Sequence, residues 1–186
     1  TFDISLADIA FALAHNIEIH LSPEANNLFA HLKLIIDRKI DSLYAVPSTL
    51  NNLYQWVELR DDVDFSSLKY IFSGGDVLSI DLIKTLKHHS PFAMIYNMYG
   101  PTEVTMNCLS IRVDNRIDEI ADTNLVPTGM PPSHLSLKLL PTGDEEQAGE
   151  TGELVVSGDQ VMKGYLNDDL RTESAFISIN GKRYYK

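Results

Sequence analysis

The chain has 186 residues, of which 44% are hydrophobic, so it is long enough for one large domain or two small ones with a sizeable core. Its formal net charge of −11 excludes an overall basic surface, so we expect no nucleic acid and no membrane among its partners, although net charge says nothing about a single cleft. The single cysteine, Cys108, excludes an intrachain disulfide and a thiolate zinc site, and with the lack of a membrane-length apolar run it favours a cytoplasmic location.

The first half of the chain alternates helix and strand signals. Apolar residues recur at helical spacing after Ser5, and Ser22 followed by Pro23 predicts the start of a second helix. A later helix is predicted to begin at the cap Ser79. Short apolar runs predict strands at residues 42–46, 68–72 and 93–96. This rhythm predicts an α/β fold with a mostly parallel sheet flanked by helices.

The second half changes to short strands joined by turns. Only residues 168–176 have a helical pattern there, and Asn180-Gly181 is a strong turn signal. Strands are predicted at residues 108–113, 135–140 and 153–157. This half therefore predicts a small β-rich, barrel-like subdomain.

The change of character divides the chain. We expect an α/β subdomain over residues 1–110 and a β-rich subdomain over residues 111–186. The chain begins at Thr1 rather than at Met and ends at Lys186 inside a predicted strand, so we expect a fragment whose second subdomain is truncated.

Two loops that follow predicted strands carry residues suited to a ligand. Residues 73–76, Ser-Gly-Gly-Asp, would let a flat ligand approach the backbone closely, although a simple strand-to-helix turn explains the same pattern. Residues 97–103, Asn-Met-Tyr-Gly-Pro-Thr-Glu, join a tight turn to the aromatic face of Tyr99 and to a hydroxyl beside a carboxylate, Thr102 and Glu103. That pair is suited to bind a phosphate oxygen and Mg²⁺. The alternative interpretation of residues 97–103 is an ordinary surface turn. Ligands of open α/β sheets collect beyond the carboxyl ends of the strands, so both loops are expected to serve one site.

Other residues give weaker signals. Asp3 precedes the first predicted helix and either caps that helix or binds a substrate ammonium group. The histidines lack metal-ligand spacing, and Ser73 lacks the Gly-x-Ser-x-Gly context of a serine hydrolase. No Gly-x-x-x-x-Gly-Lys phosphate loop occurs, so the sequence favours none of these three chemistries.

Taken together, the segments resemble the adenylate-forming superfamily, especially nonribosomal peptide synthetase adenylation domains and D-alanine–carrier protein ligases. Residues 2–5 resemble the Phe-Asp-x-Ser motif, and residues 97–103 resemble Asn-x-Tyr-Gly-Pro-Thr-Glu. Residues 152–166 resemble the Gly-Glu-Leu to Gly-Tyr-Leu motif, and Tyr185-Lys186 resembles the opening of Tyr-Lys-Thr-Gly-Asp. The order and spacing fit over nearly the whole chain, so the resemblance rests on all the motifs together.

The resemblance implies roles for individual residues in the first subdomain and the turn that follows it. Tyr99 would stack on adenine, Thr102 would contact the α-phosphate, and Glu103 would help to hold Mg²⁺. Asp3 would bind the α-amino group of an amino acid. The ATP or AMP site would comprise Gly74, Gly75, Asp76, Asn97, Met98, Tyr99, Gly100 and Thr102. The substrate pocket would comprise Asp3, Ile4, Ala7, Ala45, Phe72, Gly74, Met98, Met106 and Asn107.

The implied reaction is attack of a substrate carboxylate on the α-phosphorus of ATP, followed by transfer of the acyl group to a carrier-protein phosphopantetheine thiol. The small residues Ala7, Ala45 and Gly74 suggest an open pocket, and Phe72 with the methionines suggests an apolar one. The family's Ser/Thr/Gly-rich phosphate loop, its ribose-binding Asp and its C-terminal lid are not in this sequence, so we expect these 186 residues to be inactive alone. Two alternatives remain, namely an acyl- or aryl-CoA ligase of the same superfamily and a non-catalytic interaction module.

Overall fold

The computed structural model describes residues 4–22, 24, 27–60, 63–123, 125–141 and 151–186. They form two compact units, each of which is described by itself. The first unit holds the described residues up to Tyr99 together with Ser110–Gly129, and the second holds those of Gly100–Leu109 and Met130–Lys186. The chain therefore crosses between units at residues 99–100, 109–110 and 129–130 rather than at one point near residue 110. The reason is that the strand after Leu109 joins the sheet of the first unit.

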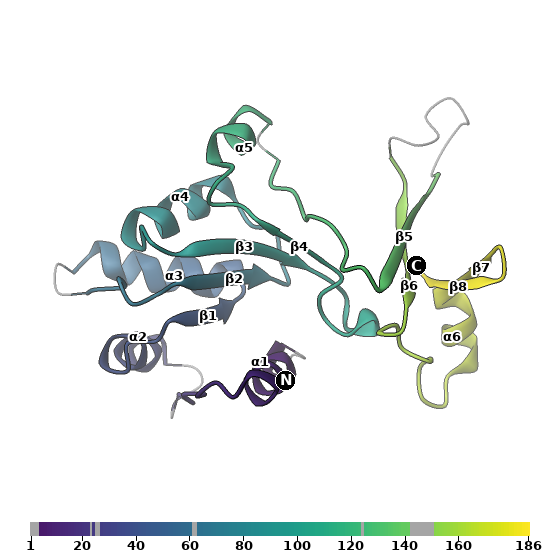
Figure 1. Ribbon diagram of the computed structural model, residues 1–186, viewed down its shortest axis with the longest axis horizontal. Helices are drawn as coiled ribbons and strands as arrows, with labels where there is room; N and C mark the ends of the chain where they lie inside the picture. Colours follow the sequence, from purple (N-terminus) through teal and green to yellow (C-terminus); the bar gives the residue numbers. More distant parts are fainter. Residues whose placement is uncertain (1–3, 23, 25–26, 61–62, 124, 142–150) are drawn as a thin grey trace. The chain divides into compact units, whose positions relative to one another are not determined.

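The first unit is built on a four-stranded sheet with the order β1-β2-β3-β4 (Figure 1). Its strands are β1 (Ser42–Ala45), β2 (Tyr70–Gly74), β3 (Met94–Tyr99) and β4 (Leu109–Arg112). β1, β2 and β3 run parallel, so Tyr44, Phe72 and Tyr96 lie side by side across them. This arrangement confirms the predicted α/β class, because parallel strands need crossover connections and helices supply them here.

The helices of this unit are α1 (Ile4–His15), α2 (Leu28–Asp37), α3 (Pro47–Glu58), α4 (Ile80–His89) and α5 (Ile117–Thr123). The predicted start of α2 at Ser22 is wrong, because the side chain of Asn27 caps the helix by accepting from the amides of Phe29 and Ala30 at 3.0 and 3.2 Å. The Ser79 cap of α4 is confirmed. α5 was not predicted, because one short helix offers too little periodicity. Within the described residues, no helix is long and apolar enough to span a membrane.

The two faces of the first sheet differ. Ile71 and Ile95 are fully buried, and they pack in one core with apolar side chains of α2, α3, α4 and α5. The opposite face carries Tyr44, Phe72 and Tyr96, which are only half-buried and whose neighbouring ring centroids lie 6.2 and 5.4 Å apart. Because side chains alternate along a strand, one face holds the unit together and the other presents an aromatic surface.

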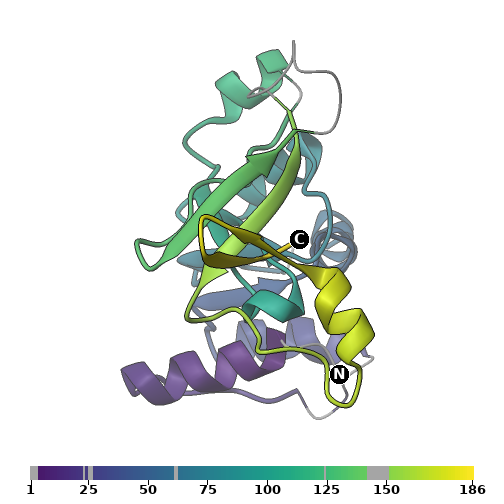
Figure 2. The same cartoon turned by 90° about the vertical axis from the view of Figure 1, so that its right-hand side faces the viewer.

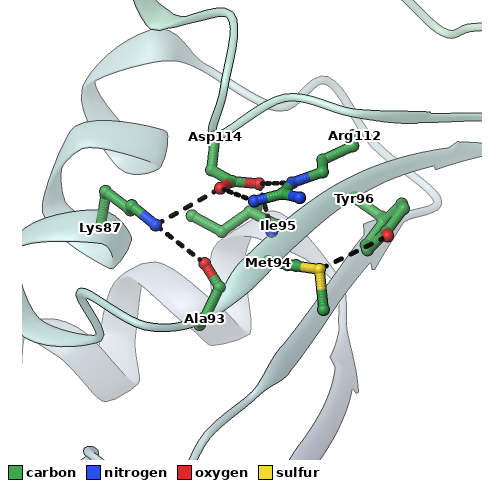
Figure 3. A network of polar contacts seen from close by, with 7 residues as sticks. All are labelled: Lys87, Ala93, Met94, Ile95, Tyr96, Arg112 and Asp114. Atoms are coloured by element: carbon green, nitrogen blue, oxygen red, sulfur yellow. Dashed lines mark hydrogen bonds and ion pairs between the residues drawn. The ribbon is translucent and has the colours of Figure 1, made fainter.

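A polar network joins β3, β4 and α4 (Figure 3). Asp114, which is 8% exposed, accepts hydrogen bonds from the Ile95 amide at 2.9 Å and from the Arg112 guanidinium at 2.8 Å. Lys87 of α4 donates to the same carboxylate at 3.3 Å and to the carbonyl of Ala93 at 3.1 Å. Burial by itself raises the pKa of Asp114. The hydrogen bonds and the charges of Arg112 and Lys87 lower it by more, so the pKa is about 2.

The second unit contains an antiparallel sheet with the order β5-β6-β8-β7 (Figure 2). Its elements are η1 (Thr102–Val104), β5 (Leu135–Leu140), β6 (Glu153–Gly158), α6 (Asp169–Ala175), β7 (Phe176–Ile179) and β8 (Lys182–Tyr185). The predicted turn at Asn180 and Gly181 is confirmed, since both have positive φ between paired strands. The β-rich prediction is also confirmed, but within the described residues the sheet is open, with β5 and β7 at its edges, rather than a closed barrel.

Candidate functional site

A candidate segment in the first unit lies at the carboxyl ends of β2 and β3. Gly74 ends β2 and Gly75 follows it, and Met98 and Tyr99 end β3 beside them. Gly75 has φ +85°, and a Cβ on it would lie 3.4 Å from Val46 and 4.0 Å from Ile4. Only glycine adopts this backbone conformation easily, so the chain turns sharply here and the backbone stays open to a flat ligand.

Polar groups at this edge are partly engaged in structure. The Asn97 side chain is buried and donates to the Pro127 carbonyl at 2.8 Å, so only its backbone is left to line a site. The Asp76 carboxylate accepts from the amide of Val77 at 2.7 Å. The Tyr99 side chain is 43% exposed, which leaves part of its surface open to contact by a ring.

Several predicted pocket residues also gather near this edge. Ile4 and Ala7 are half-buried and lie one turn apart on α1, and Ile4 approaches Gly75. Phe72 is half-buried on the aromatic face of β2, whereas Ala45 at the end of β1 packs against the core on the other face of the sheet, so the structure does not bring these two predicted pocket residues together. Asp3 lies outside the described residues.

Tyr44 is a residue that the sequence reasoning missed. A Cβ added to Gly74 would lie 2.8 Å from the Tyr44 hydroxyl and 2.8 Å from the Met98 carbonyl. The lack of a side chain at Gly74 therefore leaves no empty space, because the Tyr44 hydroxyl lies there. Strand alternation was the available signal, since it sets Tyr44 on the same face as Phe72.

A separate candidate segment, described by itself, is the turn from Gly100 to Asn107 in the second unit. Thr102 is exposed and Glu103 is half-buried in the 3₁₀ turn η1. A Cβ on Gly100 would overlap the carbonyl of Met106. Thr105 and Met106 both have positive φ, so this turn holds an uncommon backbone conformation that its surroundings must stabilise.

The segment from Gly158 to Tyr165 provides that stabilisation. Gln160 donates from Nε2 to the carbonyls of Val104 and Asn107 at 2.7 and 3.1 Å. The amide of Met162 donates to the Glu103 carbonyl at 2.8 Å, and the Tyr165 hydroxyl donates to Glu103 Oε1 at 2.7 Å. The Gly-Glu-Leu to Gly-Tyr-Leu motif therefore holds the turn that carries Thr102 and Glu103, in addition to forming part of the sheet.

Tyr185 lies in the same neighbourhood. Its ring packs against the core of the second unit, which includes Val104 and Cys108. Burial raises the pKa of the Tyr185 hydroxyl, and a hydrogen bond with Tyr165 and the negative charge of Glu103 act in the same direction. Tyr185 is therefore neutral at physiological pH.

The Glu103 carboxylate is a candidate ligand for Mg²⁺. Among the described residues, no group of three His, Cys, Asp or Glu side chains could hold a metal ion by itself. Mg²⁺ bound with a nucleotide commonly takes one or two protein carboxylates and completes its shell with phosphate oxygens and waters. A carboxylate has two oxygens, and the Tyr165 bond uses one lone-pair site of Oε1, so Glu103 fits that need.

The fold alone defines a class, an α/β protein with a parallel-stranded sheet, and ligands of such proteins bind at the carboxyl edge of the sheet. The comparisons with known proteins identify the family. A model of the AMP-binding enzyme family matches residues 1–166. The chain belongs to this family of adenylate-forming ligases, whose members use ATP.

Relatives of known name agree with the family match. The chain is 34% identical over 161 residues to bacitracin synthase 3 of Bacillus licheniformis, covering 83% of this chain and 2% of that protein. It is also 34% identical, over 113 residues, to the D-alanine–D-alanyl carrier protein ligase of the same species, covering 60% of this chain and 22% of the ligase.

A solved structure extends the likeness to the fold. The Vibrio cholerae adenylation domain AlmE, in complex with glycyl-adenosine-5′-phosphate, has a TM-score of 0.82 and 29% sequence identity to the chain. The match covers 100% of this chain and 35% of AlmE. The chain thus spans about a third of that structure and a small part of the synthase that it matches.

Proposed function

We propose that this chain is the central part of a domain that activates an amino acid with ATP and then transfers it to the phosphopantetheine thiol of a carrier protein. The observation that carries the proposal is the likeness to AlmE over the whole chain, because that structure contains an aminoacyl adenylate. The name of the D-alanine ligase supports a carrier protein as the acceptor.

In the proposed reaction, the carboxylate oxygen of the amino acid attacks the α-phosphorus of ATP and pyrophosphate leaves. The thiol sulfur then attacks the acyl carbon of the adenylate, and AMP leaves. When bound, Mg²⁺ would neutralise phosphate charge. Among the protein groups, Tyr99 stacks on adenine, the Thr102 hydroxyl donates to an α-phosphate oxygen and Glu103 holds the metal. These residues bind and orient the reactants, so rate enhancement comes from positioning and charge stabilisation.

Because the chain spans 35% of AlmE, we expect the 186 residues to lack activity alone and the experiments below to require the complete adenylation domain. Pyrophosphate exchange well above background with this chain and a suitable amino acid would contradict that expectation. Calorimetry with ATP tests the rival non-catalytic module, because a scaffold without the activity would show no nucleotide binding by the complete domain.

Replacing Asp3 by alanine is expected to raise KM for the amino acid on the order of 100-fold, because an ammonium group loses its charged partner. The measurement is ATP–pyrophosphate exchange at varied amino acid concentration. Asp8→Ala, one turn further along α1 than Ile4, is the matched control and is expected to leave KM unchanged. An unchanged KM in Asp3→Ala would favour an acyl- or aryl-CoA ligase, whose aliphatic or aromatic acid needs no counter-charge.

Replacing Tyr44 by alanine is expected to widen the pocket over Gly74. Amino acids with larger side chains should gain roughly 10-fold in kcat/KM relative to small ones, which is the usual effect of a few methylene groups in a pocket. The test is pyrophosphate exchange with a panel of amino acids. Phe92→Ala, which removes an aromatic side chain that is 78% exposed, is the control. An identical substrate profile in Tyr44→Ala would exclude Tyr44 from the pocket.

A further inference from the structure

The hydroxyl of Tyr165 contacts the side chain of Glu103, which is the proposed metal ligand. The Tyr165 hydroxyl donates to Glu103 Oε1 at 2.7 Å, although 62 residues separate the two in the chain. Both side chains are half-buried. A bond between a neutral donor and a carboxylate is among the stronger hydrogen bonds in proteins, so this contact restricts the rotamers of Glu103.

Tyr165 is itself fixed from the other side by α6 and its cap. Its amide donates to the Thr172 hydroxyl at 2.9 Å, and the Arg171 guanidinium lies 4.0 Å from the centroid of its ring. A Cβ on the preceding Gly164 would lie 2.7 Å from Thr172, so the backbone approaches α6 closely. The orientation of the tyrosine is therefore set before any ligand binds.

The backbone of the turn is held as well, by groups that do not reach the carboxylate. Met162 donates its amide to the Glu103 carbonyl at 2.8 Å, and Gln160 donates to the Val104 carbonyl at 2.7 Å. These bonds fix the position of the Glu103 backbone. The hydrogen bond from Tyr165 orients the Glu103 carboxylate, so different residues hold the backbone and the side chain.

We propose that Tyr165 is a positioning residue that presents the Glu103 carboxylate to Mg²⁺. The inference rests on the proposed function, because it assumes that Glu103 binds the metal. A site with a single protein carboxylate depends strongly on the orientation of that carboxylate. Tyr165 gives up no proton and contacts no phosphate in this role. Its contribution is a preset carboxylate orientation.

The test is Mn²⁺ binding to the complete adenylation domain with a non-hydrolysable ATP analogue, followed by electron paramagnetic resonance. Tyr165→Phe removes only the hydroxyl and is expected to weaken Mn²⁺ binding about 10-fold, as loss of a group that orients a metal ligand does elsewhere. In pyrophosphate exchange, the Mg²⁺ concentration for half-maximal rate should rise by a similar factor, with a smaller change in KM for the amino acid.

Four further variants sharpen the result. Tyr184→Phe changes the neighbouring buried tyrosine of β8, which lies near Lys138 and Lys182 rather than Glu103, and is expected to leave Mn²⁺ affinity unchanged. Arg171→Ala keeps the hydroxyl but loosens the ring, so it should weaken Mn²⁺ binding roughly 2- to 5-fold. It serves as the test if Tyr165→Phe folds poorly. The double variant Glu103→Gln with Tyr165→Phe should bind Mn²⁺ no more weakly than Glu103→Gln alone, because Tyr165 acts through the Glu103 carboxylate.

The outcomes separate the inference from the proposed function. If Glu103→Gln weakens Mn²⁺ binding and both Tyr165→Phe and Arg171→Ala do not, the positioning role is wrong and the metal role of Glu103 stands. If Glu103→Gln itself leaves Mn²⁺ binding unchanged, the metal role of Glu103 is wrong and the role of Tyr165 falls with it.

Discussion

Replacing Gly100 by alanine is expected to reduce kcat/KM for ATP–pyrophosphate exchange by at least about 100-fold in the complete domain, which is the cost of misplacing reacting groups by roughly 1 Å. The physical reason is steric. An added Cβ would overlap the Met106 carbonyl and lie 2.8 Å from the Cα of Asn107. Backbone atoms cannot move aside as a flexible side chain can. The whole turn from Thr102 to Asn107 must shift, and it carries proposed phosphate, metal and substrate contacts.

The control for this prediction is Gly181→Ala at the tip of the β7–β8 hairpin. Gly181 has φ +76°, so alanine is strained there, but nothing lies within 4 Å of the added Cβ. This variant should lose stability by about 1 kcal/mol and keep its activity. Near-normal exchange by a folded Gly100→Ala variant would show that the turn has more freedom than its contacts indicate.

Replacing Asp114 by alanine is expected to destabilise the first unit by about 2–3 kcal/mol. The buried amide of Ile95 loses its acceptor, and Arg112 and Lys87 lose the carboxylate that joins them (Figure 3). The cost stays below that of a fully buried ion pair, because the Arg112 and Lys87 side chains are 40% and 32% exposed and water can solvate them. Urea denaturation of the 186-residue chain, followed by the fluorescence of Trp56 in α3, measures the effect.

The exposed pair of Lys69 and Asp41 supplies the control, since its 3.5 Å contact joins side chains that are 67% and 53% exposed. Asp41→Ala should cost less than about 1 kcal/mol. A cost for Asp114→Ala no greater than that of the control would contradict the structural role of the network.

The same carboxylate gives a dependence on pH. The folded pKa of Asp114 is about 2, below its ordinary value of 3.8, so the folded state binds the proton less tightly than the unfolded state. Its contribution, roughly 2 kcal/mol from that difference, is fully present above pH 3.8 and is lost as pH falls toward 2. The Asp114→Ala variant should lack this part of the acid sensitivity.

Much of the fold could be predicted from local pattern. Residues 135–140 form the predicted strand, Ser79 caps α4, and Asn180-Gly181 makes the hairpin turn. These features depend on neighbours in the chain, which is why local pattern predicts them. The start of α2 was misread, because a Ser-Pro cap signal competes with Asn27, and both satisfy the same local rule.

The sequence by itself determined the family, the order of its motifs and the residue types available for a nucleotide, a metal and an amino acid. Side-chain chemistry and spacing along one strand or turn carry that information. Only the tertiary structure decided which residues distant in the chain contact the candidate site residues. The Tyr44 hydroxyl occupies the space beside Gly74, and the Tyr165 hydroxyl donates a hydrogen bond to Glu103. Residues 152–166 secure the turn that carries Thr102 and Glu103. Contacts between residues 30 to 62 positions apart depend on how strands and helices pack, and no local pattern along the chain specifies that packing.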